Sequence, residues 1–471
     1  MNGAGMPSRG HNLPMSKAYD AIIIGTGQAG PPLAGRLAAA GMKVAIAERK
    51  LFGGTCVNTG CIPTKAMVES AHAIHQARRG ADFGFNAGTV RADMQRVRAR
   101  RDEESGRLRD GLETWLRNMD NCTVYRGHAR FISSREVGVD GERLTSSRIF
   151  INVGGRAAVP KIPGLEQVPY LTNSSMMAVD SLPRHLVILG GSYVGLEFGQ
   201  MFRRFGSEVT IIEIGPRLIA REDEDVSSAI KDILEGEGIA IRLNANCTSL
   251  ANDGGEIVAK IACDGGAQEI QGSHLLLAAG RRPNTDDLGL ENRDIAVDSR
   301  GYIQVDDQLR TNVPGIWALG DCNGKGAFTH TSYNDFEIVS ANLLDNDRRR
   351  VSDRIPTYAL YIDPALGRAG MTEAEVAATG RPALRAKRLM TEVKRARLKS
   401  ETQGFMKVVV DTETQLILGA AVLGPGGDEI VHSILDVMYA RKPYTLIQRA
   451  VHIHPTVSEL IPTMLAHLDP L

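Results

Sequence analysis

Residues 21–30 read Ala-Ile-Ile-Ile-Gly-Thr-Gly-Gln-Ala-Gly, and this stretch decides the fold. Its apolar start is typical of a buried strand, and the glycines Gly25, Gly27 and Gly30 follow at once. Glycines at these positions permit a tight turn and let the backbone approach a pyrophosphate closely. The next helix then offers free N–H groups and a favourable dipole to the phosphates. We therefore predict a βαβ unit that binds a dinucleotide.

The rest of this unit fits the same interpretation. Pro31 and Pro32 fall in the first helical turn, where their missing N–H groups cost little. The second strand is predicted at residues 44–48 and ends on Glu48. A carboxylate at the end of that strand can accept the ribose hydroxyl.

Residues 185–213 repeat the design. A strand at residues 185–189 leads into Gly190, Ser192 and Gly195, and a second strand ends just before Glu213. In both units the acid stands 23 residues after the first glycine (48 − 25 = 23 and 213 − 190 = 23). One such motif is a weak signal, but two with correctly spaced acids are a strong one. Ser192 replaces the usual middle glycine, and its Cβ crowds the phosphate slightly.

A close pair of cysteines follows the first unit. Cys56 and Cys61 lie in residues 53–65, which read Gly-Gly-Thr-Cys-Val-Asn-Thr-Gly-Cys-Ile-Pro-Thr-Lys. In a regular helix their Cα atoms would be roughly 8–9 Å apart, beyond the limit of about 7 Å for a disulfide. Gly60 is placed to bend the segment. A small strained bridge is easily reduced, so we predict a redox couple.

Two dinucleotide folds and a dithiol together imply an electron relay. One fold would hold a flavin permanently, and the other a nicotinamide that comes and goes.

Composition excludes several classes of function. Lys+Arg and Asp+Glu both count 55 in 471 residues, so no nucleic-acid or membrane partner is expected. No apolar run reaches the ~18 residues of a membrane span. Residues 1–18 are expected to be a disordered extension without a signal peptide, in which Met15 could be an alternative start. Six cysteines in a long chain do not make a disulfide framework, which favours the cytoplasm.

Two further motifs complete a family resemblance. Residues 311–321 read Thr-Asn-Val-Pro-Gly-Ile-Trp-Ala-Leu-Gly-Asp, and residues 452–459 read His-Ile-His-Pro-Thr-Val-Ser-Glu. From about Tyr19 to about Met464 the chain resembles the FAD-dependent pyridine nucleotide–disulfide oxidoreductases. The resemblance implies an α/β fold with two Rossmann-like dinucleotide-binding domains and a C-terminal α+β dimerisation domain.

The same resemblance implies domain boundaries. FAD binding is expected at residues 19–159 and 283–346, and NAD(P) binding at residues 160–282. Residues 347–471 are expected to form the dimerisation domain. The crossover at residues 152–154 reads Asn-Val-Gly where many members have Ala-Thr-Gly, a departure from which little change is expected.

Roles for the redox residues also follow from the resemblance. Cys61 is implied to be the thiol nearest the flavin, in a thiolate–flavin charge-transfer pair, and Cys56 the thiol that attacks the substrate. Lys65 is implied to lie near the flavin N5 and to pair with Glu197. Tyr193, four residues before Glu197, matches the family's gate to the nicotinamide pocket.

His454 and Glu459 resemble the family's acid–base pair. His454 is implied to come from the other subunit of a homodimer and to exchange a proton with Cys56, while Glu459 orients its imidazole. A helix N-terminus, a nearby cation and a base all lower a thiol pKa, which is ordinarily near 8.5.

Cofactor contacts are implied residue by residue. The predicted FAD-binding residues are Gly25, Gly27, Gly30, Glu48, Gly54, Thr55, Gly154, Gly320 and Asp321. The predicted nicotinamide-binding residues are Gly190, Ser192, Tyr193, Gly195, Glu213 and Gly280. Glu213 favours NADH over NADPH, although Arg217 and Arg221 lie close enough in sequence to blur that choice. No metal site is predicted.

The electron acceptor is the open question. Residues 150–154, 328–336 and 394–397 resemble the mercuric-reductase-like branch, and within it the reactive-chlorine-resistance flavoproteins, which are proposed copper(II) reductases. The chain has no C-terminal Cys–Cys pair and no N-terminal CxxC domain, so mercury detoxification is not expected. A thiol, disulfide or metal-ion acceptor is expected; dihydrolipoamide dehydrogenase, a glutathione-reductase-like enzyme and a redox-sensing flavoprotein are the alternatives.

Overall fold

The computed structural model describes residues 16–133, 135–264 and 266–471, and the chain divides into two compact units. The first comprises the chain up to Asn58, Arg107–Arg156 and Arg282–Val351. The second comprises Thr59–Gly106, Ala157–Arg281 and Ser352–Leu471.

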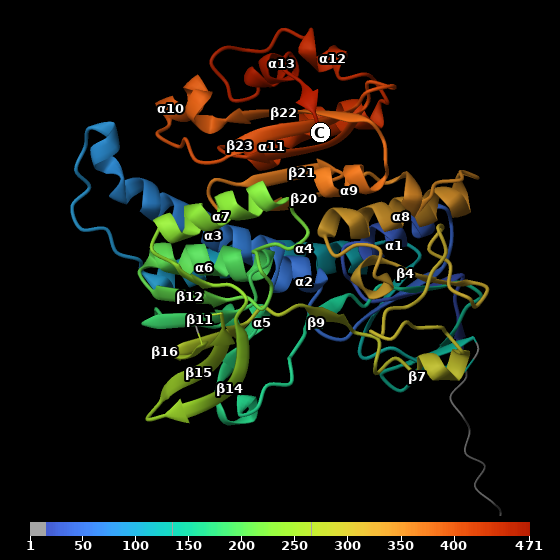
Figure 1. The fold of residues 1–471 in the computed structure, drawn as a ribbon. Helices are drawn as coiled ribbons and strands as arrows, with labels where there is room; N and C mark the ends of the chain where they lie inside the picture. The colour runs from blue at the N-terminus through green and yellow to red at the C-terminus, as the bar shows by residue number, and fades with distance from the viewer. Residues whose placement is uncertain (1–15, 134, 265) are drawn as a thin grey trace, which may run out of the picture. The chain divides into compact units, whose positions relative to one another are not determined.

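The first unit is built on a parallel sheet in the order β19-β8-β2-β3-β4, whose edge strand β4 is labelled in Figure 1. Its strands are β2 (Ala21–Ile24), β3 (Val44–Glu48), β4 (Cys122–Arg126), β8 (Ile149–Ile151) and β19 (Ile316–Ala318). The strands β2 and β3 have the predicted bounds, since each is a continuous apolar run, as strands covered on both faces require.

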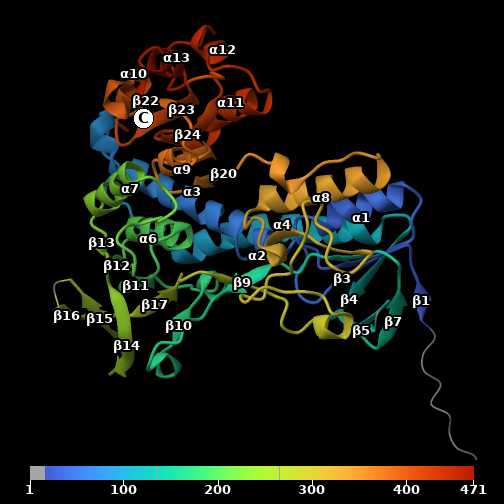
Figure 2. The same cartoon turned by 45° about the vertical axis from the view of Figure 1, so that its right-hand side comes forward.

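Alternate residues of this sheet face two different layers. Ile23 and Ile46 pack against α1 (Gly30–Ala39), α8 (Thr329–Leu344) and the C-terminal end of α4 (Met94–Arg117). Ile22 and Ala45 pack on the opposite side, against β5 (Arg130–Ser133), β6 (Glu136–Val139) and β7 (Glu142–Thr145). Figure 2 shows α1 and α8 on one side of β3 and β4, and β5 and β7 on the other.

The last two residues of the predicted disordered extension are ordered. Lys17–Ala18 forms the short strand β1, which pairs in parallel with β7. The ammonium of Lys17 also contacts the Glu142 carboxylate at 2.6 Å. Backbone pairing of this kind is decided by a strand far along the chain, so local composition could not predict it. Residues 1–15 lie outside the described residues.

The second unit contains the second parallel sheet, in the order β10-β17-β11-β12-β13. Its strands are β10 (Tyr170–Leu171), β11 (His185–Leu189), β12 (Glu208–Ile212), β13 (Ala240–Arg242) and β17 (His274–Leu277). One face carries the helices α3 (Cys61–Arg78), α6 (Tyr193–Phe205) and α7 (Glu224–Gly236). The other carries the antiparallel strands β14 (Asn246–Asp253), β15 (Glu256–Cys263) and β16 (Gly266–Gly272) (Figure 1).

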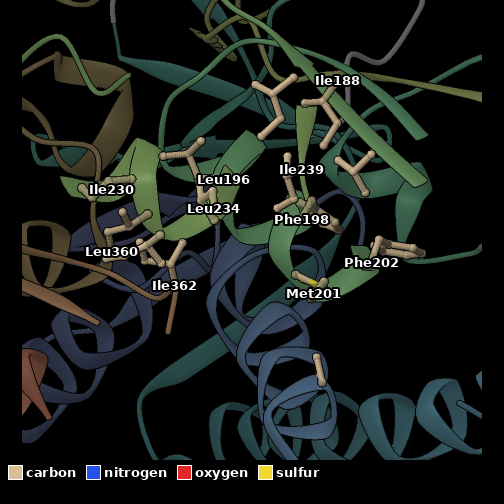
Figure 3. Packing of buried hydrophobic residues seen from close by; sticks show 14 of the residues in the cluster. Ile188, Leu196, Phe198, Met201, Phe202, Ile230, Leu234, Ile239, Leu360 and Ile362 are labelled. Carbon is tan, nitrogen blue, oxygen red and sulfur yellow. The ribbon is translucent and has the colours of Figure 1, made fainter. Parts of the chain in front are cut away.

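The core of this unit gathers around α6. Leu196, Phe198 and Phe202 of this helix are at most 1% exposed and pack with Ile188 of β11 (Figure 3). Leu360 and Ile362, from the chain that enters the C-terminal sheet, join the same cluster. The residue between them, Tyr361, is thereby brought to α6.

The C-terminal part of the second unit is a six-stranded antiparallel sheet in the order β20-β21-β24-β23-β22-β25. Its strands are β20 (Thr357–Leu360), β21 (Leu366–Gly370), β22 (Ala383–Leu389), β23 (Phe405–Asp411), β24 (Ile417–Leu423) and β25 (Asp469–Pro470). The helices α11 (Gly427–Tyr439), α12 (Thr445–Gln448) and α13 (Leu460–Leu465) contribute to its core. The predicted α/β fold, with two parallel sheets and an α+β C-terminal part, is confirmed.

Shorter elements connect these layers. They are α2 (Gly54–Asn58), α5 (Asn173–Met176), α9 (Glu373–Ala378), α10 (Lys394–Leu398), β9 (Gly155–Ala157), β18 (Arg281–Pro283) and the 3₁₀ turns at 80–83, 165–167, 290–293, 320–323, 351–353 and 390–392. Among the helices of the described ranges, none has both the length and the hydrophobicity needed to span a membrane.

A buried ionic cluster lies within the second unit. The guanidinium of Arg368 on β21 donates two hydrogen bonds to the carboxylate of Glu222, and both side chains are at most 3% exposed. Nearby, Lys407 of β23 contacts Asp223 at 2.8 Å and Asp225 at 2.7 Å. Every residue of β23 is buried, so its lysine requires these partners.

Replacing Glu222 tests how much this cluster contributes to the free energy of unfolding. We expect Glu222→Gln to lower the free energy of unfolding by about 3 kcal/mol, because Arg368 stays buried with its charge poorly compensated. Urea unfolding at neutral pH measures the loss. The control is Glu256→Gln, which removes an exposed partner of Arg184 and should cost under about 1 kcal/mol. Equal losses in the two variants would contradict the prediction.

Candidate active site

The predicted bend between the two cysteines is present. Cys56 lies in the short helix α2, and Cys61 is the first residue of α3. Gly60 separates the two helices with φ −134° and ψ −118°, which is not a helical conformation. The dithiol therefore does not lie on one continuous helix, and Cys61 stands at a helix N-terminus, where the dipole favours a thiolate.

Lys65 lies one turn after Cys61 on α3 and meets Glu197 of α6. Its Nζ atom is 3.1 Å from Oε1 and 2.8 Å from Oε2 of that carboxylate. The Glu197 side chain is 5% exposed, and its Oε1 also accepts the backbone N–H of Tyr361 at 3.1 Å. The expected contact between Lys65 and Glu197 is thus present, while the role of Lys65 at a flavin stays a prediction.

The backbone around the first glycine motif is packed so closely that two of its glycines leave no room for a Cβ atom. Gly25 has φ +102°, and a Cβ there would come within 2.3 Å of the carbonyl oxygen of Asn152. A Cβ on Gly30 would lie 2.4 Å from the carbonyl oxygen of Gly25. The carboxylate of Glu48 accepts the Thr26 N–H at 3.0 Å and the Thr26 hydroxyl at 2.7 Å, so it faces the turn.

Asn152 has a role at this turn that the sequence did not predict. Its Oδ1 atom accepts the N–H of Gly30, the first residue of α1, at 3.0 Å. Its Nδ2 atom donates to the Leu319 carbonyl at 3.0 Å. The side chain is buried and joins the glycine turn to the segment that precedes Asp321. The asparagine at this crossover thus takes part in the contacts of the glycine turn, while the expectation that the departure from Ala-Thr-Gly changes little stays a prediction.

The remaining predicted residues of the first unit gather near this turn. A Cβ on Gly54 would lie 3.0 Å from the Cα of Gly27, so the two backbones face each other. The hydroxyl of Thr55 is 3.5 Å from the Gly155 carbonyl, next to Gly154. Gly320 and Asp321 begin a 3₁₀ turn held by Asp335, whose carboxylate accepts the Gly320 N–H at 2.8 Å.

A cavity of about 580 Å³ opens where β3 ends, and the glycine motifs gave no sign of it. Its lining residues are Arg49, Lys50, His128, Arg156, Asp286 and Asp287. Oδ1 of Asp287 is buried and has no hydrogen-bond partner in the described part of the chain. Since Arg49 and Lys50 follow Glu48 directly, the cavity suits the adenosine end of a dinucleotide.

In the second glycine motif, as in the first, a carboxylate accepts a backbone N–H of the turn. Gly190 has φ +120°, and a Cβ on Gly195 would meet the Gly190 carbonyl oxygen at 2.0 Å. The carboxylate of Glu213 accepts the N–H groups of Gly191 at 2.6 Å and Gly215 at 2.8 Å. The acid therefore lies at the glycine turn, as the spacing predicts.

The other residues predicted for nicotinamide binding lie at the start of α6 and after β17. Ser192 precedes α6 in an extended conformation, and Tyr193 is its first residue. Gly280 has φ +116° and open space where a Cβ would be. Their contacts with a nicotinamide stay predictions.

His454 and Glu459 form the expected pair. The Nδ1 atom of His454 is 2.8 Å from Oε2 of Glu459. The imidazole is 64% exposed, while the carboxylate is only 12% exposed. A bond at Nδ1 leaves Nε2 on the exposed side of the ring, where it can exchange a proton with another group.

Two other thiols are unsuited to redox chemistry. Burial raises the pKa of Cys322 to about 12 and that of Cys122 to about 11. Both remain protonated near neutral pH, and thiols react mainly as thiolates.

Comparison with known proteins identifies the family to which the chain belongs. Residues 19–335 match the family described as pyridine nucleotide-disulphide oxidoreductase, and residues 356–465 match its dimerisation domain. The chain belongs to the pyridine nucleotide-disulphide oxidoreductases. It is an enzyme of the class that uses FAD and NAD(P)H.

Three relatives illustrate the breadth of this family. The chain is 37% identical to the probable pyridine nucleotide-disulfide oxidoreductase RclA of Escherichia coli over 455 residues, which cover 94% of this chain and 97% of the relative. It is 32% identical to a dihydrolipoyl dehydrogenase of Thermus scotoductus (94% and 96% covered). It is 33% identical to a mercuric reductase of Streptomyces lividans (94% of each chain).

Solved structures of the first relative match closely. The HOCl-induced flavoprotein disulfide reductase RclA from Escherichia coli superposes with a TM-score of 0.87 at 35% identity, covering 95% of this chain and 99% of that chain. A Cu(II) complex of the same protein matches with a TM-score of 0.86.

The described residues fit FAD at the first glycine motif. The crowded glycines, the facing carboxylate of Glu48 and the unpaired oxygen of Asp287 suit a dinucleotide. Within residues 16–133, 135–264 and 266–471, no group of three or more His, Cys, Asp or Glu side chains is arranged to hold a metal ion.

A second ionic contact supports the helix that begins at Cys61. Nδ1 of His72 on α3 is 2.8 Å from Oδ2 of Asp363, which also accepts from Arg204 at 2.7 Å. The hydrogen bond to Asp363 raises the pKa of His72. Although burial acts against it, the bonds from His72 and Arg204 hold the pKa of Asp363 far below its usual range.

The raised pKa of His72 predicts a pH-dependent contribution to stability. Protonation of His72 favours the folded state below about pH 6.5, the ordinary histidine pKa, and this contribution is lost as the pH rises through the folded pKa. We expect His72→Gln to lower the urea midpoint more at about pH 5.5 than at about pH 9.

His75→Gln is the matched variant on the same helix. Burial lowers the pKa of His75, so this residue reduces the stability of the wild type as the pH falls. The urea midpoint of His75→Gln should therefore rise relative to that of the wild type in acid. The same pH trend in both variants would contradict the assignment.

Proposed function

We propose that this enzyme passes electron pairs from NADH through FAD to the Cys56–Cys61 disulfide and on to a metal ion, with copper(II) as the favoured acceptor. The observation that carries the proposal is the redox segment itself. Cys61 begins α3, and one turn later Lys65 is held by the buried carboxylate of Glu197.

The domain boundaries expected from the family are part of the proposal. Residues 19–159 and 283–346 would bind FAD, residues 160–282 NADH, and residues 347–471 a second copy of the chain. FAD, when bound, supplies a two-electron carrier between the nicotinamide and the dithiol.

The chain's own residues would divide the remaining work. Cys61 faces the flavin and Cys56 faces the acceptor, while Lys65 places a positive charge near both the flavin and the Cys61 thiolate. Tyr193 gates the nicotinamide pocket. We propose that His454 reaches Cys56 of the partner chain, with Glu459 fixing its ring, since the imidazole is largely exposed in a single chain.

Two findings favour copper(II). The relative whose solved structure matches this chain with a TM-score of 0.87 was also solved as a Cu(II) complex. Oxidation of a dithiol to a disulfide releases two electrons and two protons, which reduces two copper(II) ions to copper(I). Thiolates are soft ligands, so the reduced dithiol can bind the copper ion before the electrons move, and its oxidation to a disulfide then removes these ligands and releases copper(I).

A disulfide acceptor is the second candidate, and the His454–Glu459 pair favours it. An imidazole held at 2.8 Å by a carboxylate can move the protons that thiol–disulfide exchange requires. Dihydrolipoyl dehydrogenase, at 32% identity, is the relative that represents this chemistry.

Anaerobic reduction with NADH tests the relay. We expect a broad absorption band beyond the flavin peak to form in wild type as the disulfide is reduced, and no such band in Cys61→Ser. Cys56→Ser should show the band before NADH is added and lose it when the flavin is reduced, because no disulfide is left to accept the electrons. Both cysteine variants should lose turnover with copper(II), mercury(II), lipoamide and glutathione disulfide alike. Cys322→Ser, which removes a buried protonated thiol, is the control and should behave as wild type.

The outcomes separate the proposals. Flavin bleaching without the band in wild type would mean that the dithiol is not coupled to the flavin. Among the acceptors, a kcat/KM for lipoamide above that for copper(II) would replace the first candidate by the second.

Nicotinamide choice gives a separate prediction at Glu213. A carboxylate accepts the ribose 2′-hydroxyl of NADH and repels the 2′-phosphate of NADPH. We expect wild type to favour NADH, and Glu213→Gln to lower kcat/KM for NADH by about tenfold, the loss of a charged hydrogen bond. Glu208→Gln, at the exposed start of the same strand, should change neither value. A tenfold preference of wild type for NADPH would refute the assignment.

A further inference from the structure

The ammonium of Lys65 has two different partners. On one side lie both oxygens of Glu197, at 3.1 and 2.8 Å. On another side the ring of Tyr361 approaches, with its centroid 4.2 Å from Nζ. Tyr361 also donates its backbone N–H to Oε1 of Glu197 at 3.1 Å. One residue therefore contacts both members of the ion pair.

The ring meets the ammonium as a neutral aromatic. Burial, with the charges of Asp428, Glu197 and Cys61 as smaller causes, raises the pKa of Tyr361 to about 12. The phenol is therefore protonated near neutral pH, and no phenolate–ammonium ion pair forms. A cation within about 6 Å of a ring centroid is attracted by the negative face of the ring.

Two restraints fix a side chain that is otherwise flexible. Lysine carries its charge on a four-carbon stem with three rotatable donors. Glu197 takes the ammonium from one direction and the Tyr361 ring borders it from another, although the Lys65 side chain is still 30% exposed. Residues four apart on a helix share one face, so Lys65 lies on the face of α3 that carries Cys61.

We infer that Tyr361 is a positioning residue, whose ring holds the Lys65 ammonium in place and thereby tunes the flavin and the Cys61 thiolate electrostatically. This inference rests on the proposed function, which places Lys65 beside the flavin. A fixed positive charge favours both the reduced flavin and the thiolate, because each is more negative than its oxidised or protonated form.

The experiment uses the FAD-loaded enzyme and two readouts. These are the flavin midpoint potential and the long-wavelength band formed on anaerobic reduction with NADH. Tyr361→Leu keeps the backbone N–H to Glu197 but removes the ring. Losing one cation–π contact shifts an equilibrium by about fivefold, which for a two-electron couple is about 20 mV. We expect the potential to fall by about that amount and the band to weaken.

Tyr361→Phe should restore both readouts, since it keeps the ring and loses only the hydroxyl. Phe405→Leu is the control, because it removes a ring that lies 3.8 Å from the Lys387 ammonium in the C-terminal sheet. It should leave the potential and the band as in wild type.

A series of fluorinated phenylalanines at position 361 tests the inference even if Tyr361→Leu does not fold. Phenylalanine with one, two and three ring fluorines at position 361 keeps nearly the same shape while the negative face weakens. The potential should fall stepwise along the series. A constant potential along the series, or the same loss in Tyr361→Phe as in Tyr361→Leu, would overturn the inference. A wild type without the band would count against the relay, while the series still tests Tyr361.

Discussion

One buried carboxylate, that of Glu197, connects three segments that are distant in the sequence. It accepts hydrogen bonds from Lys65 on α3 and from the N–H of Tyr361, which directly follows β20 of the C-terminal sheet. It stands on α6, four residues after Tyr193. An ionised carboxylate that is 5% exposed is costly without such partners, so all three segments must keep their places around it. The helix of the dithiol is thereby tied to the helix of the second glycine motif.

The two glycine motifs share the contact between acid and turn but differ in the residue at the middle position. In each, an acid at the end of the second strand accepts an N–H from the turn, and this fixes the turn before any dinucleotide arrives. The first turn keeps Gly27, whose Cβ would meet Asn152 at 3.0 Å, and the second has Ser192 in an extended conformation. Both turns are closely packed, since a Cβ on Gly30 would lie 2.4 Å from the Gly25 carbonyl oxygen and one on Gly195 would lie 2.0 Å from that of Gly190.

Much of this architecture could be predicted from local patterns. Strands 21–24, 44–48, 185–189 and 208–212 match to the residue, because continuous apolar runs bounded by glycine or an acid leave little choice. Local patterns did not predict partners far along the chain, and the pair Lys65–Glu197 was expected only from the family resemblance. Lys407 reads as part of an alternating strand, yet it is buried against Asp223, which lies 184 residues earlier (407 − 223 = 184). The cavity beside Asp287 could not be predicted from the sequence because its lining residues come from separate segments of the chain.

Asn152, where many members of the family have alanine, is hydrogen-bonded into its surroundings. Its amide is donor and acceptor at once, toward Leu319 and Gly30. An alanine there would remove both bonds, leaving the Gly30 N–H with the Gly27 carbonyl and the Leu319 carbonyl with the Cys322 thiol, a weak donor. The side chain at position 152 is therefore part of the hydrogen-bonding pattern of the turn and not a neutral spacer. A designer who grafts this turn into another member of the family would need to move Asn152 with it, since the glycines alone carry only part of the geometry.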